Sequence, residues 1–184
     1  MGLGPSAAFS IGQRYAGEET MTRAEAGHRS YEAPDRYADA YYGLPELEGA
    51  AGRTTVRDIT ADSALFERYR DAVDRSGFGK VLEGPGPLTL FVPVDHAFAQ
   101  LSESERNALF ADSARLVQML SNQVVRGRLA ATDLIQRDHV DTIGGQRVAL
   151  DQGGHAISIG DADIVKTDLI AGNGVVHIID GLNL

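Results

Sequence analysis

The end of the chain constrains the fold most, because short β-prone runs follow one another there with glycine turns between them. Gly144-Gly145 and Gly153-Gly154 each separate two such runs, as expected for antiparallel strands joined by tight turns. Upstream, Ser63–Ser76 places its apolar residues on one helical face. Asp62 or Ser63 can cap its start, and Gly77 supplies a left-handed stop. Helices in the first part and strands in the last are typical of the α+β class.

Local patterns predict further elements. Leu88–Val92 is an almost wholly apolar run that Pro93 ends, which predicts a buried strand. Ser102 and Glu105 form a capping box, and a second helix begins near 112–113. Strands are also predicted at 123–125, 140–143, 147–150, 156–159, 162–165 and 174–179, and a short helix at 130–135.

Residues 1–53 differ from the rest, and we expect an extended or weakly ordered, non-globular arm there. The stretch up to Gly52 holds five of the six tyrosines, and its four Arg stand against eight acidic residues. It has no apolar stripe at helical spacing, so it lacks a core of its own. Tyrosine offers a large contact area for little lost side-chain entropy. The candidate contacts with a partner are therefore Tyr31, Tyr37, Tyr41 and Tyr42.

The composition narrows the classes of function. The chain has 184 residues and a net charge of -9 at pH 7, and an acidic surface repels phosphate backbones. We therefore expect no nucleic-acid partner. The absence of cysteine excludes disulfides, thiolate metal sites and a cysteine nucleophile. No window approaches the roughly 18 apolar residues that a membrane-spanning helix needs.

Patterns for catalysis and metal binding are missing from the sequence. There is no G-x-S-x-G elbow and no G-x-x-x-x-G-K-[ST] phosphate loop, so we expect neither an enzyme nor a bound cofactor. His139, His155 and His177 lack the HxxxH or HxH spacing that would bring them together on a metal, so no metal site is predicted. We interpret His177 as a core histidine bonded to a backbone carbonyl or to an Asp, the alternative being an acid–base or ligand-contacting histidine.

Two stretches stand out for their residue order. The first is Thr89-Leu-Phe-Val-Pro-Val-Asp-His-Ala-Phe98, and the second is Asn173-Gly-Val-Val-His-Ile-Ile-Asp180. They resemble the two signature motifs of fasciclin domains, in the expected order. The resemblance covers residues 54–184 and leaves the arm out.

This resemblance implies a wedge of two small antiparallel β-sheets with helices packed along one side. It also implies that the two motifs are neighbouring core segments, with Phe91 close to Ile178. Their residues fit a structural role, because Asp95 caps the turn after Pro93 and Asn173-Gly174 offers a positive φ before the last strand. The signature residues are Thr89, Phe91, Pro93, Asp95, Phe98, Asn173, Gly174, His177 and Asp180.

Two short segments bear on adhesion. Fasciclin domains often carry a Tyr-His pair at the end of the helical half, linked in animal matrix proteins to integrin adhesion. Asn122-Gln123 stands at that place here, a departure that argues against animal-type integrin binding. Asp168 and Leu169 are similar to another adhesion-linked segment of the family and are candidate interaction residues. The alternative is that Leu169 simply packs in the core.

We therefore predict a non-enzymatic protein-interaction module for adhesion or scaffolding, whose N-terminal arm docks on a partner. Two alternatives stay open. One is a carrier of a small apolar ligand such as a carotenoid or lipid, and the other is a peripheral subunit of a larger membrane-associated assembly. The resemblance favours a periplasmic or extracellular location, whereas the sequence as given begins without a secretion signal, which leaves the cytoplasm open.

Overall fold

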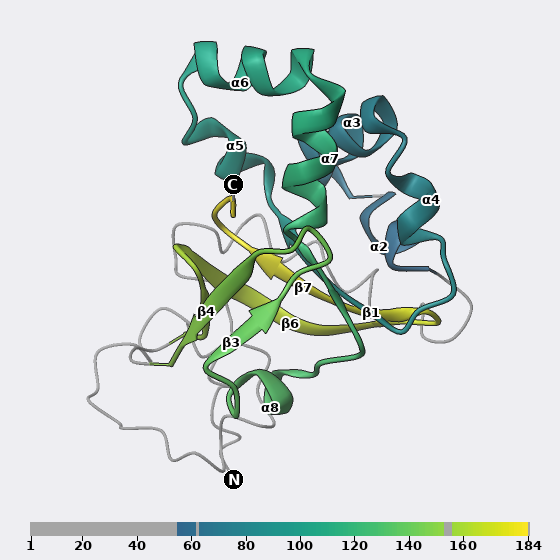
Figure 1. Ribbon diagram of the computed structural model, residues 1–184, viewed down its shortest axis with the longest axis vertical. Helices are drawn as coiled ribbons and strands as arrows, with labels where there is room; N and C mark the ends of the chain where they lie inside the picture. The colour runs from purple at the N-terminus through teal and green to yellow at the C-terminus, as the bar shows by residue number, and fades with distance from the viewer. Residues whose placement is uncertain (1–54, 62, 153–155, 184) are drawn as a thin grey trace, which may run out of the picture.

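The computed structural model describes residues 55–61, 63–152 and 156–183, and the helices of these residues all precede the last five strands (Figure 1). The helices are α2 (Val56–Ala61), the 3-10 helix η5 (Ala64–Phe66), α3 (Glu67–Ser76), α4 (Gly79–Leu82), α5 (Asp95–Ala99), α6 (Glu103–Ala111), α7 (Ser113–Ser121) and α8 (Ala131–Leu134). The strands are β1 (Leu88–Pro93), β2 (Val124–Arg126), β3 (His139–Asp141), β4 (Arg147–Asp151), β5 (Ser158–Ile159), β6 (Ala162–Ala171) and β7 (Gly174–Ile179). Among these helices none is long and apolar enough to span a bilayer.

The strands form one hydrogen-bonded order, β2-β1-β7-β6-β5-β4-β3. The expected α+β class is confirmed. One feature goes beyond the expectation of antiparallel sheets, because β1 and β7 pair in parallel while the other neighbours are antiparallel. These two strands lie far apart in the chain, so no tight turn has to join them and a parallel pairing is open to them.

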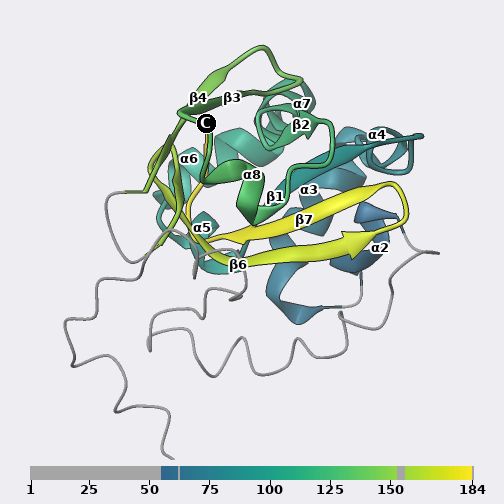
Figure 2. The same cartoon turned by 90° about the horizontal axis from the view of Figure 1, so that it is seen from below.

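The two ends of this strand order meet. Val125 of β2 forms an isolated antiparallel bridge with Thr142, just after β3. Beside it, the backbone N–H of Ile143 donates to the Val124 carbonyl at 2.8 Å. Seen from below, α8 lies between β3 and β4 on one side and β6 and β7 on the other (Figure 2). The curved sheet therefore encloses an interior of its own.

The Gly144-Gly145 hairpin is confirmed, since β3 and β4 pair antiparallel and Gly145 has φ 86°. Its connection is longer than the two residues predicted, because β3 ends at Asp141 and β4 begins at Arg147. The backbone N–H of Ile143 bonds to Val124 of β2, so it cannot continue the β3–β4 ladder. Gly153-Gly154 lies outside the described residues.

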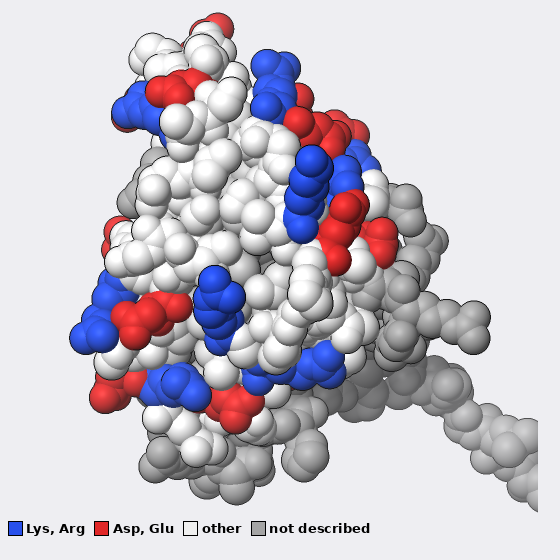
Figure 3. All heavy atoms as spheres, turned by 45° about the vertical axis from the view of Figure 1, so that its right-hand side comes forward, with Lys and Arg blue, Asp and Glu red and all other residues white. Residues whose placement is uncertain are grey.

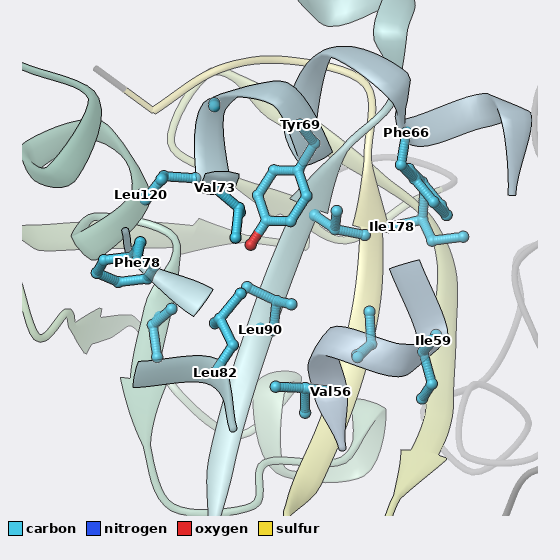
Figure 4. Packing of buried hydrophobic residues seen from close by; sticks show 14 of the residues in the cluster. Val56, Ile59, Phe66, Tyr69, Val73, Phe78, Leu82, Leu90, Leu120 and Ile178 are labelled. Carbon is cyan, nitrogen blue, oxygen red and sulfur yellow. The ribbon is translucent and has the colours of Figure 1, made fainter. Parts of the chain in front are cut away.

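The hydrophobic core has two parts, one on each side of β1 and β7. On the helical side, Tyr69 of α3 packs with Leu90 of β1 and Ile178 of β7 (Figure 4). On the other side, Phe91 belongs to a cluster with apolar residues of α8, β3, β4 and β6. Every residue of β1 and of β7 is buried, which explains their continuous apolar runs.

The helix ends follow the predicted caps with one exception. Ser63 accepts from the Leu65 backbone, Gly77 ends α3 at φ 71°, and Ser102 forms the capping box with Glu105. The exception is Asp95. We predicted that it caps its own turn, and this prediction is wrong. Its Oδ1 accepts the Arg68 N–H at 2.8 Å, so this carboxylate caps the start of α3, which the linear sequence could not reveal.

We expected Asn173-Gly174 to supply a positive φ before the last strand, and this expectation is wrong. Gly174 is not among the residues with a positive φ. A Cβ at this position would instead collide with the Leu88 carbonyl oxygen and lie 3.0 Å from Val56 Cγ1. Glycine is needed because β7 passes very close to the backbone of β1 at its first residue.

Candidate functional site around His177

The parallel pairing places the two signature motifs side by side. In its register Phe91 lies opposite His177, and Val92 lies opposite Ile178. The rings of Phe91 and His177 stack with their centroids 5.4 Å apart and their planes 26° apart. On the other edge of β1, the backbone carbonyl of Gln123, the residue before β2, accepts the Phe91 N–H at 2.8 Å. The two motifs thus meet through a buried pair of stacked rings.

The polar signature residues form hydrogen bonds with other segments of the same chain. The Thr89 hydroxyl donates to the Gly127 carbonyl at 2.7 Å and accepts the Leu129 N–H at 2.9 Å. In the second motif, Asp180 Oδ1 accepts the Asp163 N–H at 2.9 Å. The apolar signature residues Pro93 and Phe98 are buried. Each of these positions holds two segments of the fold together.

Asn173 forms three side-chain hydrogen bonds with distant segments. Its Nδ2 donates to the carbonyls of Leu82 and Gly84 at 2.8 and 2.9 Å, and its Oδ1 accepts the Val56 N–H at 2.8 Å. The side chain therefore ties the β6–β7 turn to the end of α4 and the start of α2.

His177 is fully buried and bonded through both ring nitrogens. Its Nε2 lies 2.7 Å from the Leu129 carbonyl oxygen, and its Nδ1 lies 3.3 Å from the Asp168 backbone nitrogen. A carbonyl only accepts and a backbone N–H only donates, so these partners assign the neutral ring with its proton on Nε2. Burial lowers the pKa of His177, although the Leu129 bond and the Asp168 charge oppose that shift. This is the arrangement of a structural core histidine.

Asp168 is exposed and stands beside this histidine. Its Oδ1 accepts the Ala131 N–H at 2.9 Å, at the start of α8. Leu169, the next residue, is 3% exposed and packs in the core on the helical side. Contact with a partner at this segment would therefore fall to Asp168, since Leu169 presents almost no surface. The tyrosines Tyr31, Tyr37, Tyr41 and Tyr42 lie outside the described residues.

Gln123 is a feature whose importance the sequence did not reveal. Its side chain is fully buried, and neither its Oε1 nor its Nε2 has a hydrogen-bond partner among the described residues. Asn122, its neighbour, is also buried, but its Oδ1 accepts from Gln118 Nε2 at 3.2 Å. The only signal in the sequence was that Asn122-Gln123 departs from the family pattern.

Replacing Gln123 with leucine is expected to raise the free energy of unfolding by about 1–3 kcal/mol. A buried amide without partners loses its bonds to water on folding, whereas an apolar side chain of similar size loses none. Urea unfolding of the two proteins measures the difference. The matched control is Gln118→Leu at an exposed, bonded position, which should not stabilise. A loss of stability in Gln123→Leu would show that this amide has a partner.

The free energy of unfolding is also expected to fall on acidification from about pH 6.5 toward pH 5. Burial lowers the pKa of His177 in the folded protein below its ordinary 6.5, so the unfolded chain binds the proton more tightly. Stability is thus unaffected by this group above about pH 6.5 and declines below it, by up to about 1.4 kcal/mol per pH unit. Urea unfolding at several pH values measures the slope, which should be shallower in His177→Gln. An equal slope in both proteins would contradict this account.

The chemistry available around His177 is limited. Among the described residues, no group of three or more His, Asp or Glu side chains could hold a metal ion. The imidazole itself is enclosed, neutral and bonded at both nitrogens. A general base must reach the proton that it removes from a substrate, and this ring has no free nitrogen for that task. The site therefore supports the architecture of the domain.

The family follows from a comparison with family models. The model of the Fasciclin domain matches residues 64–182, which is more than half of the chain. This chain belongs to the fasciclin domain family. The matched region of this fasciclin domain contains both signature motifs, which the pairing of β1 with β7 places side by side.

Individual relatives agree with this assignment. An uncharacterized Synechocystis protein, sll1735, is 31% identical over 127 residues, covering 69% of this chain and 95% of that protein. Transforming growth factor-beta-induced protein ig-h3 of Sus scrofa is 30% identical over 128 residues, but the match spans only 19% of its length. In the solved structure of a domain pair from the insect cell adhesion molecule Fasciclin I, the similarity covers 72% of this chain and 51% of that one, with a TM-score of 0.63 and 17% identity. That likeness concerns the fold.

Proposed function

We propose that this chain is a non-enzymatic protein-interaction module for adhesion or scaffolding. Residues 1–53 and the outer face of the fasciclin domain would supply the contacts with a protein partner. The observation that carries the proposal is that the motif residues Thr89, Asn173 and His177 use their polar atoms on the chain's own backbone. The outer surface of the domain is then the part that remains available for contacts with a partner.

The charge pattern of the surface supports this proposal. On the face shown in Figure 3, Lys and Arg lie close to Asp and Glu around a broad uncharged area. The centres of protein interfaces are depleted in charged residues, and their rims are polar. Such a face suits a protein partner better than a phosphate backbone, which would call for a patch of one positive sign.

A relative adds support by analogy. The domain pair of similar fold comes from a protein described as an insect cell adhesion molecule. A shared fold alone does not transfer a function, so this relative supports an adhesion role by analogy only. The five tyrosines of the stretch up to Gly52 fit the same role, because tyrosine is a frequent anchor in interfaces.

An adhesion assay tests the proposal. Surfaces would be coated with the full chain, with the chain lacking residues 1–53, or with an unrelated acidic protein of similar size. We expect the full chain to retain cells of the source organism, or beads carrying the same chain, several-fold above the unrelated protein. Deletion of residues 1–53 should reduce that retention. Retention equal to the unrelated protein would overturn the proposal, and undiminished retention after the deletion would remove the arm from it.

A further inference from the structure

Asp168 occupies an unusual place in the backbone. It is the single non-glycine residue with a positive φ, 62°, in the part of the chain that the structure describes. Left-handed backbone costs a side-chain-bearing residue on the order of 1 kcal/mol, although Asp tolerates it better than most. The β6–β7 register also shifts between Lys166 and Leu169, around this residue. The ladder here is already irregular, so this residue can change its bonds without breaking regular pairing.

Asp168 links two elements through two bonds of different kinds. Its backbone N–H donates to His177 Nδ1 at 3.3 Å, and its carboxylate Oδ1 accepts the Ala131 N–H at 2.9 Å. The first bond requires an unprotonated Nδ1, since a protonated nitrogen offers no lone pair. The second bond holds the first turn of α8.

We propose that Asp168 and His177 form an acid-sensitive switch, in which protonation of the ring moves the Asp168 carboxylate from the start of α8 to the imidazolium. This inference goes beyond the proposed function and does not depend on it. Its consequence is a change at the exposed junction of β6 and α8, where Asp168 lies at the surface.

The proton balance of the switch is simple. A proton from solvent binds Nδ1, and the Asp168 N–H loses its acceptor. The carboxylate then accepts the new Nδ1–H, which is a stronger, charge-assisted bond. The Ala131 N–H is left to water, while the Nε2–H bond to the Leu129 carbonyl is kept. No covalent bond other than the N–H bond forms or breaks.

The charged groups around the His177 ring favour the Asp168 carboxylate as its partner after protonation. On β1 the neighbour is the uncharged ring of Phe91. Charged residues on the other neighbouring elements are Asp163, Lys166 and Asp168 on β6, Arg128 before α8 and Asp133 within it. Asp163 is engaged by the Ser158 hydroxyl at 2.6 Å. Asp133 is engaged by the Ala130 N–H at 2.9 Å, and Arg128 donates to the Ala171 carbonyl at 3.1 Å. Only Asp168 raises the pKa of His177 through its charge, among the residues that the structure describes.

Amide hydrogen exchange of the full chain, followed by NMR at about pH 7 and about pH 5, tests the switch. After correction for intrinsic exchange, we expect the Ala131 and Asp168 amides to lose protection about tenfold or more at the lower pH. The amides of β1 and β7 should lose distinctly less, no more than the expected fall in the free energy of unfolding accounts for. Unchanged protection at Ala131 and Asp168, or a loss shared equally with β1 and β7, would overturn the proposal.

Two variants separate the switch from ordinary acid loosening. Asp168→Asn keeps an acceptor for the Ala131 N–H and tolerates the left-handed backbone, but it carries no charge to pair with the ring. His177→Gln removes the titrating group. In both, the Ala131 amide should stay protected at about pH 5, whereas His139→Gln at an exposed position should behave as the parent. Release in Asp168→Asn equal to the parent would overturn the proposal even if His177→Gln failed to fold.

Discussion

Replacing Phe91 with alanine is expected to lower the free energy of unfolding by about 3–5 kcal/mol. The Phe91 side chain is fully buried, and its ring stacks on His177 with the centroids 5.4 Å apart. Truncation removes the transfer free energy of the ring and leaves a cavity in the cluster that Phe91 forms with apolar residues of α8, β3, β4 and β6. Because β1 pairs on both edges, the surrounding backbone has little freedom to collapse into that space. Urea unfolding followed by circular dichroism measures the loss.

Phe110→Ala is the matched control for this prediction. Phe110 is half-buried at the end of α6, where its ring lies 6.0 Å from that of Phe98 and near the Arg75 guanidinium. Its loss should cost distinctly less, about 1–2 kcal/mol, because solvent already reaches part of the ring. Equal losses in the two variants would mean that Phe91 is not at the centre of the fold.

Replacing Gly174 with alanine is expected to cost about 3 kcal/mol, the upper end of what overpacking usually costs. The added methyl group would collide with the Leu88 carbonyl oxygen, and that oxygen belongs to the backbone of β1. Relief requires β1 and β7 to move apart where their parallel pairing begins, at the Leu88–Gly174 pair. Thermal and urea unfolding would measure the loss, and the Asn173 bonds nearby should weaken with it.

Gly79→Ala serves as the control for the same change of residue. At that position the new Cβ would lie 3.0 Å from Arg57 Cζ, which is the mobile end of a long side chain. Gly79 is also the first residue of α4, where alanine is the better helix former. We expect a change within about 1 kcal/mol of the parent. A loss in Gly79→Ala as large as that in Gly174→Ala would show that glycine content, and not the close approach of strands, sets the effect.

Local sequence determined the elements whose causes lie within a few residues. The caps at Ser63, Ser102 and Gly77 formed as predicted, because each bond joins neighbours in the chain. The largely apolar runs of β1 and β7 indicated buried strands. The two motifs also identified the family, since their residue order reports a shared fold.

Features that depend on distant neighbours were decided only by the tertiary structure. Asp95 caps α3 and not its own turn, and Gly174 is required by the backbone of β1 and not by a positive φ. The same holds for the parallel direction of β1 and β7 and for the two bonds of Asp168. It also holds for the buried Gln123 amide, which has no hydrogen-bond partner among the described residues. A residue's own type fixes what it can bond or pack against. The partner it meets across the fold is set by how remote segments come together, which no local pattern encodes.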